Sequence, residues 1–244
     1  MNRNIVEYDN VTVIIGNKKI LSDASCSIPR KALTFLVGEN GSGKTTLVKS
    51  ILGLLPIAAG NISFHSTNGT KPILGYVPQN VIFPTPFKLT VSEYLKYAAQ
   101  VPRDKITTVI KRVDFPETHL SRNITELSGG QAQKMLLAAE LYRSPDLLFL
   151  DEPLSNVDDS GEKHIIDVIL DVKNEGVSVV IITHDWQFVS SYGDHVICLN
   201  RNFICDSGYC VCKNSLSKVN IKNIQKTSPD SNSTHAGYCY IENI

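Results

Sequence analysis

Gly38-Glu39-Asn40-Gly41-Ser42-Gly43-Lys44-Thr45 is the stretch that decides the fold of this chain of 244 residues. It fits the pattern G-x-x-x-x-G-K-[ST], in which glycines let backbone N–H groups close around phosphate oxygens. In such a loop the lysine, here Lys44, reaches the β- and γ-phosphates, and the hydroxyl of Thr45 ligates Mg²⁺. The alternative is a glycine-rich turn that binds nothing.

The segments on both sides of this loop have the structure that a phosphate-binding loop requires. Residues 32–37 form a short apolar run, as expected of a buried strand that leads into the loop. Residues 47–52 repeat apolar positions four apart, which predicts a helix, and Gly53 stands where a C-terminal cap is favoured. The positive N-terminal end of that helix would point at the bound anion.

A second apolar run, residues 147–150, ends in Asp151-Glu152. Two adjacent acids directly after a buried strand are hard to explain by packing and favour a nearby cation. Asp151 fits an acid that supports Mg²⁺, generally through water, and Glu152 fits the residue that polarises the attacking water. The alternative is an exposed loop with two solvated acids.

Leu127-Ser128-Gly129-Gly130-Gln131 is the second decisive motif, and it precedes a predicted helix over residues 131–143. Ser128 stands where an N-cap is favoured, so its hydroxyl and two backbone N–H groups would face outward from a positive helix end. This predicts another anion site. One chain cannot readily bring both anion sites to one phosphate if they lie at opposite ends of a lobe.

Together the two motifs resemble those of the ATP-binding cassette (ABC) ATPases. The resemblance implies an α/β fold of the P-loop NTPase type, an ABC-type nucleotide-binding domain with an antiparallel β edge region and a helical lobe. It also implies a homodimer of ATPase subunits. Two chains would pair head to tail, so that the second motif of one subunit closes over ATP held by the first motif of its partner.

The resemblance assigns roles to individual residues. Glu152 matches the catalytic base, and Gln79 matches the glutamine that senses the membrane partner and can reach Mg²⁺ or the lytic water. His184 matches the switch histidine that contacts the γ-phosphate, although a lone histidine at a strand end is more often structural. The residues expected to bind ATP within one chain are Gly38, Glu39, Asn40, Gly41, Ser42, Gly43, Lys44, Thr45 and Thr46. Those expected to bind ATP held by the partner are Ser128, Gly129, Gly130 and Gln131. The residues expected around Mg²⁺ are Thr45, Gln79 and Asp151.

One further residue, Asp158, is expected in the loop Ser155-Asn156-Val157-Asp158, which resembles the family's loop across the dimer interface. Many members also stack an aromatic on adenine from the position before the glycine that corresponds to Gly16. This chain has Ile15 there, and Tyr8 could substitute only if the fold brought it near. Base selectivity therefore stays open.

Beyond the superfamily, roughly residues 5 to 208 resemble the ATPase subunits of bacterial zinc and manganese importers. The segments that carry this resemblance are Ile20-Leu21-Ser22-Asp23, Gly75-Tyr76-Val77-Pro78-Gln79, Leu89-Thr90-Val91, and residues 195–200 with 205–208. It implies an ATP-hydrolysing motor subunit of a membrane importer for zinc, manganese or iron. No His-rich tail is present to favour zinc among these ions.

The same resemblance implies the partners and the location. The partners are a polytopic permease and, indirectly, an extracytoplasmic metal-binding protein. The chain would lie at the cytoplasmic face of the plasma (inner) membrane, peripheral through the permease. The helical lobe, next to Gln79 and Phe83-Pro84-Thr85-Pro86-Phe87, would receive a short cytoplasmic permease helix in an apolar groove.

Composition limits the alternatives. Lys plus Arg and Asp plus Glu both number 24, so no overall basic field favours nucleic acid, and a DNA-maintenance ATPase is disfavoured. No signal peptide is evident, and no apolar run nears the roughly 18 residues needed to cross a bilayer, so we expect the chain to stay in the cytoplasm. A soluble ABC-type ATPase of iron-sulfur cluster assembly, or an importer ATPase for another cargo, remains the alternative.

Residues 1–212 are expected to form the ABC ATPase domain, with the helical lobe at about 81–144. Residues 213–244 are expected to form a polar tail that includes a mobile segment, because they are rich in Ser, Asn, Lys and Thr. Cys210 and Cys212 form a C-x-C pair that could hold a soft metal. Only Cys239 and His235 follow, not a second pair at zinc-site spacing, so the role of these cysteines stays open.

Overall fold

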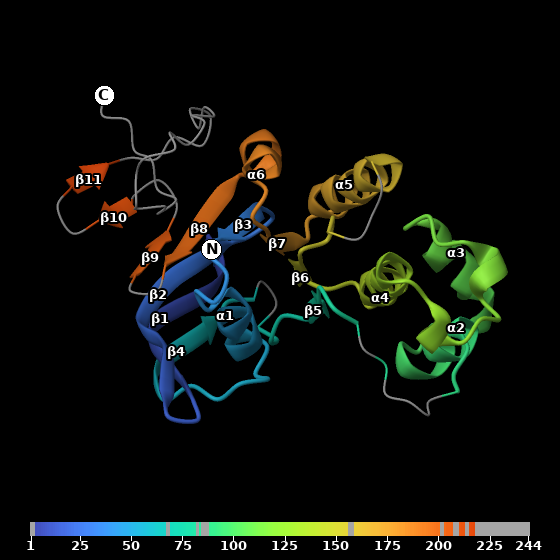
Figure 1. The fold of residues 1–244 in the computed structure, drawn as a ribbon, viewed down its shortest axis with the longest axis horizontal. Coiled ribbons are helices and arrows are strands. Elements are labelled where there is room, and N and C mark those ends of the chain that lie inside the picture. Colours follow the sequence, from blue (N-terminus) through green and yellow to red (C-terminus); the bar gives the residue numbers. More distant parts are fainter. Residues whose placement is uncertain are drawn as a thin grey trace. The chain divides into compact units, whose positions relative to one another are not determined.

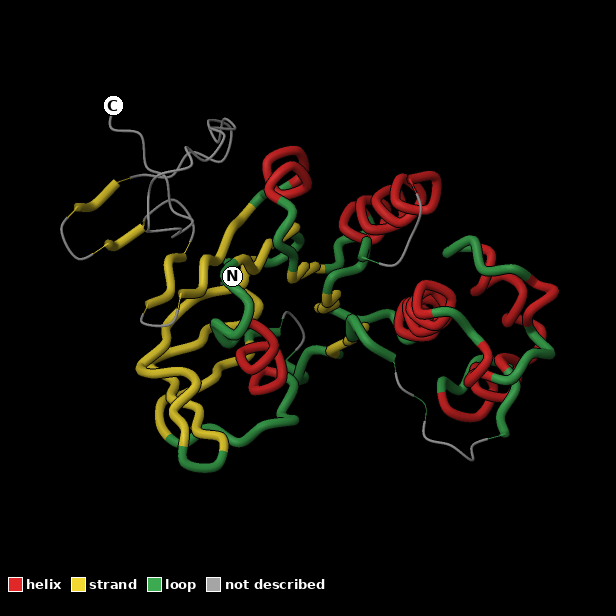
Figure 2. The backbone as a smooth tube through the Cα atoms, in the orientation of Figure 1, coloured by secondary structure: helices red, strands yellow, loops and turns green. Residues whose placement is uncertain are grey.

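The computed structural model describes residues 3–66, 69–81, 83, 88–155, 159–200, 203–206, 210–212 and 215–217. The chain divides into two compact units. The first unit comprises Arg30–Ala32 and Ser66–Ile181 together with Met1, and the second comprises Asn2–Pro29, Leu33–His65 and Ile182–Ile244. Figure 1 labels the helices and strands, and Figure 2 separates them by type.

The second unit contains the antiparallel edge region that the sequence predicts. Strands β1 (Asn4–Ile15), β2 (Lys18–Pro29) and β4 (Ala59–Phe64) form a sheet in the order β2-β1-β4. Gly16, with φ of +58°, lies in the tight turn that pairs Ile15 with Lys18. This backbone conformation is open to glycine at little steric cost, which permits the short connection.

Three further strands of the second unit lie side by side, and the first of them, β3, leads into the phosphate-binding loop. β3 (Leu33–Val37) is buried along its whole length and pairs in parallel with β8 (His195–Asn200). β8 then pairs antiparallel with β9 (Phe203–Asp206). A separate antiparallel pair joins β10 (Cys210–Cys212) to β11 (Ser215–Ser217).

Two helices of the second unit have distinct terminal signals. α1 (Lys44–Ile51) follows the loop directly, and Gly53, with φ of +74°, terminates it as predicted. The N–H of Leu54 donates to the carbonyl of Lys49 at 2.8 Å, a bond typical of a glycine-terminated helix. α6 (Trp186–Tyr192) was not predicted. The Asp185 carboxylate caps it by accepting the N–H groups of Gln187 and Phe188, at 2.8 and 3.2 Å.

The first unit contains strands β5 (Leu74–Val77), β6 (Leu147–Asp151) and β7 (Ser178–Ile182), in that order, and Ile182 itself belongs to the second unit. β5 and β6 are parallel, with Tyr76 opposite Phe149. Their carboxyl ends therefore lie at the same edge of the sheet. β6 and β7 are buried along their whole length, as expected of strands covered on both faces.

The helical segments of the first unit comprise several short ones and two longer helices, α4 and α5. They are α2 (Val91–Glu93), the π-type turn η1 (Tyr94–Ala98), the 3-10 turns η2 (Arg103–Lys105), η3 (Glu117–His119) and η4 (Ile124–Glu126), and α3 (Ile106–Lys111), α4 (Gly129–Tyr142) and α5 (Asp159–Asn174). The helix predicted at residues 131–143 is thus confirmed.

The structure defines the start and the buried face of α4. The helix begins at Gly129, two residues earlier than predicted, and it buries Leu137 and Leu141. Leu136 is half-buried and Tyr142 is exposed. The apolar residues of this segment are almost continuous, so their spacing alone does not define one face.

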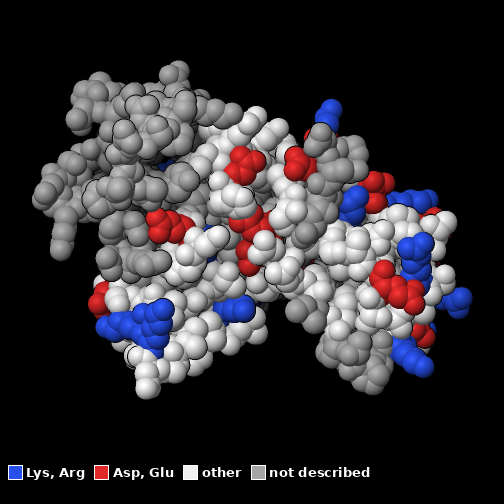
Figure 3. Space-filling view, viewed as in Figure 1, with Lys and Arg blue, Asp and Glu red and all other residues white. Residues whose placement is uncertain are grey.

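Neither unit shows a strongly basic surface in the view of Figure 3, where Lys and Arg side chains are interspersed with Asp and Glu. This agrees with the equal numbers of basic and acidic residues. Within the described ranges, no helix has the length and apolar character needed to cross a bilayer. The tail predicted for residues 213–244 lies outside the described residues apart from β11.

Candidate nucleotide-binding site

Lys44 is fixed against the glycine-rich loop that precedes it. Its ammonium donates to the carbonyl oxygens of Gly38 at 2.7 Å and of Glu39 at 2.9 Å. The side chain is almost fully buried. A buried ammonium that already bonds two carbonyls of its own loop is a positive charge held in one place, as phosphate binding requires.

The loop also contains a buried hydroxyl without a partner. Ser42 is 3% exposed, and its Oγ makes no hydrogen bond to the protein. An unpaired buried hydroxyl costs about 1–3 kcal/mol, so its persistence calls for an explanation. A phosphate oxygen would satisfy it. Gly41, with φ of +79°, faces open space, because a Cβ built there would meet no atom within 4 Å. The loop residues therefore fit a bound phosphate.

Gly38 enters the loop in close contact with β8. A Cβ atom at this position would lie 2.1 Å from the carbonyl oxygen of Leu199, and φ is +149°. No other residue type fits this space without moving the backbone. Glu39 is half-buried, Asn40 is exposed, and Thr45 and Thr46 occupy the first turn of α1. Gly43 precedes that turn and supplies no side-chain cap.

The acid pair lies at the end of β6 in the first unit. Asp151 is buried as the last residue of the strand, and the Tyr76 hydroxyl lies 3.5 Å from its Oδ2. Burial and the Asp151 charge raise the pKa of Tyr76 to about 12, so this hydroxyl keeps its proton at neutral pH. Glu152 follows in the left-handed region, with φ of +49°, which is uncommon for a residue with a side chain.

Gln79 follows β5 and is exposed. Its backbone carbonyl accepts a hydrogen bond of 3.0 Å from Nε2 of Gln133, a residue of α4. Sequence reasoning missed Gln133. The available signal was weak, because Gln133 stands between Gln131 and Lys134 in the most polar turn of the helix.

The predicted second motif forms the N-terminus of α4. Ser128 Oγ accepts the N–H of Gln131 at 3.3 Å, and Gln131 Oε1 accepts the N–H of Ser128 at 3.1 Å. This reciprocal arrangement is a capping box. Ser128 and Gly129 are exposed, whereas Gly130 is buried. The expected N-cap is thus confirmed, and the turn leaves Ser128 and Gly129 exposed.

The remaining predicted residues are placed in part. His184 is exposed between β7 and α6 in the second unit. Asp158 lies outside the described residues, as do Asn156 and Val157 and the stretch from Pro84 to Phe87. Within the second unit the structure brings Lys44 against Gly38 and Glu39. Within the first it brings Gln79 to Gln133 and Tyr76 to Asp151.

Tyr8 does not replace the missing adenine-stacking aromatic. It is 2% exposed, and its hydroxyl lies 2.9 Å from Ser50 Oγ of α1. Burial raises the pKa of Tyr8 to about 12. A side chain enclosed in this way has no face for a purine. Ile15 is 46% exposed at the end of β1, where an apolar contact is available but π-stacking is not.

The cysteines described in detail behave as expected of thiols. Cys26 is buried and Cys198 half-buried, and neither forms a disulfide. In the parts of the chain that the structure describes, no group of three or more His, Cys, Asp or Glu side chains could hold a metal ion. The side chains of Cys210 and Cys212, and all of Cys239, lie outside the described residues.

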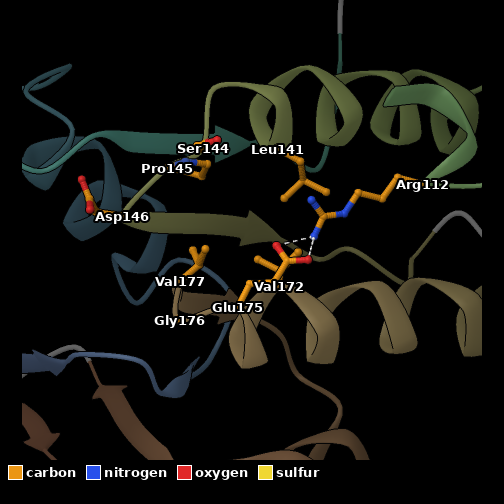
Figure 4. A pocket seen from close by; sticks show the side chains of 9 residues that line it. All are labelled: Arg112, Leu141, Ser144, Pro145, Asp146, Val172, Glu175, Gly176 and Val177. Atoms are coloured by element: carbon orange, nitrogen blue, oxygen red, sulfur yellow. Dashed lines mark hydrogen bonds and ion pairs between the residues drawn. The ribbon is translucent and has the colours of Figure 1, made fainter. Parts of the chain in front are cut away.

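A pocket of about 320 Å³ in the first unit contains none of the predicted ATP or Mg²⁺ residues. Figure 4 shows Arg112 reaching from the end of α3 to the Glu175 carboxylate beside it, with contacts of 2.6 and 2.7 Å. Both partners of this ion pair are substantially exposed. The guanidinium is already occupied by its own carboxylate, so the pocket is not a candidate phosphate site.

A family model described as ABC transporter matches residues 21–155. Curated relatives are named "Zinc import ATP-binding protein ZnuC". The relative from Cereibacter sphaeroides is 35% identical over 212 residues, which cover 86% of this chain and 85% of that protein. The relative from Buchnera aphidicola subsp. Acyrthosiphon pisum is 36% identical over 226 residues, 91% of this chain and 92% of that protein.

Solved structures agree on the fold. An ATP-binding subunit of an ABC transporter superposes with a TM-score of 0.73 at 22% identity, over 83% of this chain and 89% of that one. A dimeric ATP-binding cassette in a post-hydrolysis state, bound to ADP and Pi, gives 0.71 at 21% identity, over 87% and 98%. The α/β fold with an antiparallel edge sheet and a helical lobe is therefore confirmed.

Proposed function

Because this chain belongs to the ABC transporter family, we propose that it is the ATP-hydrolysing subunit of a membrane importer for a divalent metal, zinc. The nucleotide site is supported by the loop itself, which contains the fixed Lys44 ammonium and the unpaired, buried Ser42 hydroxyl. The observation that carries the cargo is the run of zinc-import relatives that match most of the chain.

The residues of the loop bind the phosphates of ATP. Lys44 pairs with the β- and γ-phosphate oxygens, and the Ser42 hydroxyl gains the partner that it otherwise lacks. Thr45, Gln79 and Asp151 would hold Mg²⁺, which when bound neutralises phosphate charge during phosphoryl transfer. Tyr76 keeps Asp151 in position from the neighbouring strand.

Glu152 is the general base, which polarises the attacking water. His184 contacts the γ-phosphate from the loop after β7 and orients that water. These roles match the kinds of side chain present, a half-buried carboxylate and an exposed imidazole. They assign the activation of the attacking water to these two residues and leave ion selection to other components of the importer.

The turn that begins α4 serves the partner subunit. Ser128, Gly129, Gly130 and Gln131 of one copy close over ATP held by the loop of the other, because a helix N-terminus carries unpaired N–H groups and a partial positive charge. The exposed position of Ser128 and Gly129 supports this assignment. Two such subunits would make two composite sites.

The partners of the pair are a polytopic permease and, through it, an extracytoplasmic zinc-binding protein. The subunit would be peripheral at the cytoplasmic face of the membrane. A permease helix would dock on the helical lobe beside Phe83, whose ring meets Tyr94 edge-on at 5.9 Å. Co-purification from detergent-solubilised membranes separates this role from that of a soluble assembly ATPase, which would bring no permease.

The cargo is tested with the reconstituted complex of this subunit, its permease and its binding protein. ATP hydrolysis should rise when zinc-loaded binding protein is added and stay basal with the metal-free form. The same complex built with Glu152→Gln is the control, since it assembles without turnover. If the zinc-loaded protein has no effect, or if cells lacking the chain accumulate zinc normally while losing another nutrient, the zinc assignment is wrong.

A further inference from the structure

Gln133 is a buried polar side chain in the apolar interior of the first unit. It is 4% exposed and lies five residues after Ser128 on α4. Its Nε2 donates to the carbonyl of Gln79 at 3.0 Å and lies 3.5 Å from that of Pro78. Its Oε1 is buried without a hydrogen-bond partner. The amide is therefore anchored through its donor side alone.

The other end of this connection is the capped first turn of α4. The reciprocal bonds between Ser128 and Gln131 make that turn rigid. A helix rises about 1.5 Å per residue, so Gln133 sits roughly 7.5 Å along the axis from Ser128. A displacement of the Ser128 turn must move Gln133 with it.

The orientation of Gln79 depends on its backbone. The Gln79 carbonyl belongs to the peptide unit that follows its Cα, so a bond to that oxygen restrains the direction of the exposed Gln79 side chain. β5 fixes the chain before this point, as its last residue Val77 pairs opposite Leu150 of β6. Gln133 supplies a second fixed point, from a different element.

We propose that Gln133 is a positioning residue that couples the Ser128 turn of α4 to Gln79. Closure of two subunits on ATP displaces the Ser128 turn, and Gln133 transfers that displacement to the Gln79 peptide. The Gln133 amide is held through its Nε2 donor alone, so the connection is released when that donor leaves the Gln79 carbonyl. The catalytic consequence rests on the proposed function, whereas the tether between α4 and Gln79 does not.

Gln133→Met removes the amide while keeping an unbranched side chain of similar length. Losing one neutral hydrogen bond corresponds to about a threefold to tenfold effect. Backbone amide exchange over residues 76–81 of the nucleotide-free protein should rise by about that factor. The kcat for ATP should fall by a similar factor, with KM changed by less than about twofold, because the phosphate-binding loop is untouched.

Lys134→Met is the matched control. It removes a long polar side chain from the next position of α4, where Lys134 contacts Asp114 and not the Gln79 peptide. It should leave exchange at residues 76–81 and the kcat unchanged. Equal effects of the two substitutions would show a general loosening of α4 and overturn the proposal, as would wild-type exchange and kcat in Gln133→Met.

If Gln133→Met melts below the assay temperature, Gln133→Leu replaces it, and a third measurement needs no change at this position. Adding MgATP to the Glu152→Gln variant should alter exchange at residues 76–81 and 127–133 together. A change confined to one of the two segments contradicts coupling. Absence of ATP hydrolysis in the wild type would refute the proposed function, while the nucleotide-free exchange still decides the tether.

Discussion

Lys44 and Ser42 give the loop two groups suited to binding an anion, a fixed positive charge and an unpaired hydroxyl. The ammonium is held by two carbonyls, and the hydroxyl waits without a partner. Both arrangements are less favourable alone than with a bound phosphate, because the charge and the hydroxyl are buried. Part of the binding free energy therefore comes from relieving the loop.

Lys44→Ala should remove most triphosphate binding. A charge-assisted hydrogen bond is worth about 1.5–3 kcal/mol, which corresponds to roughly a 10- to 150-fold weaker Kd. Titration with a fluorescent ATP analogue measures it. Lys49→Ala, in the last turn of the same helix, is the control and should keep wild-type affinity. Unchanged affinity in Lys44→Ala would discard the phosphate-loop assignment.

Glu152 combines the proposed base with a left-handed backbone, at φ of +49°. That conformation costs a residue with a Cβ about 1–2 kcal/mol, and glycine much less. Glu152→Gly should therefore have a larger free energy of unfolding than Glu152→Ala, by about 1 kcal/mol, although both lack the carboxylate. Urea denaturation compares them. Equal stability, or a more stable alanine variant, would show that the backbone at this position is unstrained.

Tyr8, like Tyr76, makes the stability depend on alkaline pH. Its pKa is raised to about 12, so the folded state keeps the hydroxyl proton where the unfolded chain, with an ordinary pKa near 10, loses it. The free energy of unfolding should hold steady below pH about 10 and fall between about 10 and 12.

Tyr8→Phe should lower the free energy of unfolding at neutral pH by about 0.5–1.5 kcal/mol, through the lost bond to Ser50. It should also make the alkaline decline smaller, leaving the part that comes from Tyr76. Nucleotide affinity should not change, since the ring is enclosed. Tyr97→Phe, at a 65% exposed site, is the control for pH. Weaker ATP binding by Tyr8→Phe would reopen a role in base recognition.

At the scale of elements, two helices of the first unit carry the same N-terminal device. Ser128 with Gln131 caps α4, and Thr90 with Glu93 caps α2. Only the first is predicted to face ATP. The pair allows the contribution of a cap to helix stability to be separated from its contribution to the partner's nucleotide site.

Ser128→Ala and Thr90→Ala should each lower the free energy of unfolding by about 0.5–2 kcal/mol, the usual cost of losing such a cap. Only Ser128→Ala should also weaken ATP-driven dimerisation. Thermal melts measure the first effect, and analytical ultracentrifugation with MgATP measures the second. If both variants dimerise alike, the exposed turn of α4 does not contact nucleotide.

The elements that sequence predicted well are those with local signals. α1 has a glycine loop before it and Gly53 after it, and α4 has Ser128 before it and Ser144-Pro145 after it. α6 was missed because it has only seven residues. A helix this short has too few apolar positions for a period to show.

The residues of the candidate site could be predicted from their motifs, but the contacts between distant residues could not. Its loop, acid pair and second motif each have a fixed local spacing that chemistry demands, so their residues could be named in advance. Two other contacts could not be predicted. They are the bond between Tyr8 and Ser50, 42 residues apart, and the bond between Gln133 and Gln79, 54 residues apart. Such contacts depend on how β1 and α1, or β5 and α4, pack, and no local pattern encodes that.

At the scale of the whole molecule, the proposed function requires two copies. Glu152→Gln keeps the shape of the side chain and removes the base, so ATP should bind and hold two subunits together while turnover falls by about 10²–10⁴-fold. Size-exclusion chromatography with and without MgATP should show the dimer only in the presence of nucleotide. A variant that hydrolyses ATP normally contradicts the mechanism. The complex with the permease is the stronger sample if the isolated pair dissociates.

Gly38 has a consequence for genetic screens. A Cβ atom at this position would lie 2.1 Å from the carbonyl oxygen of Leu199, a residue of β8 that stands 161 residues further along the chain. In a saturation library selected for growth on scarce zinc, we expect every replacement at codon 38 to be lost, alanine included. Codon 41, which faces open space, should instead tolerate residues that accept a left-handed backbone, such as asparagine. Two glycines of one motif would then yield opposite mutational profiles, because a Cβ atom meets β8 at position 38 and no protein atom at position 41.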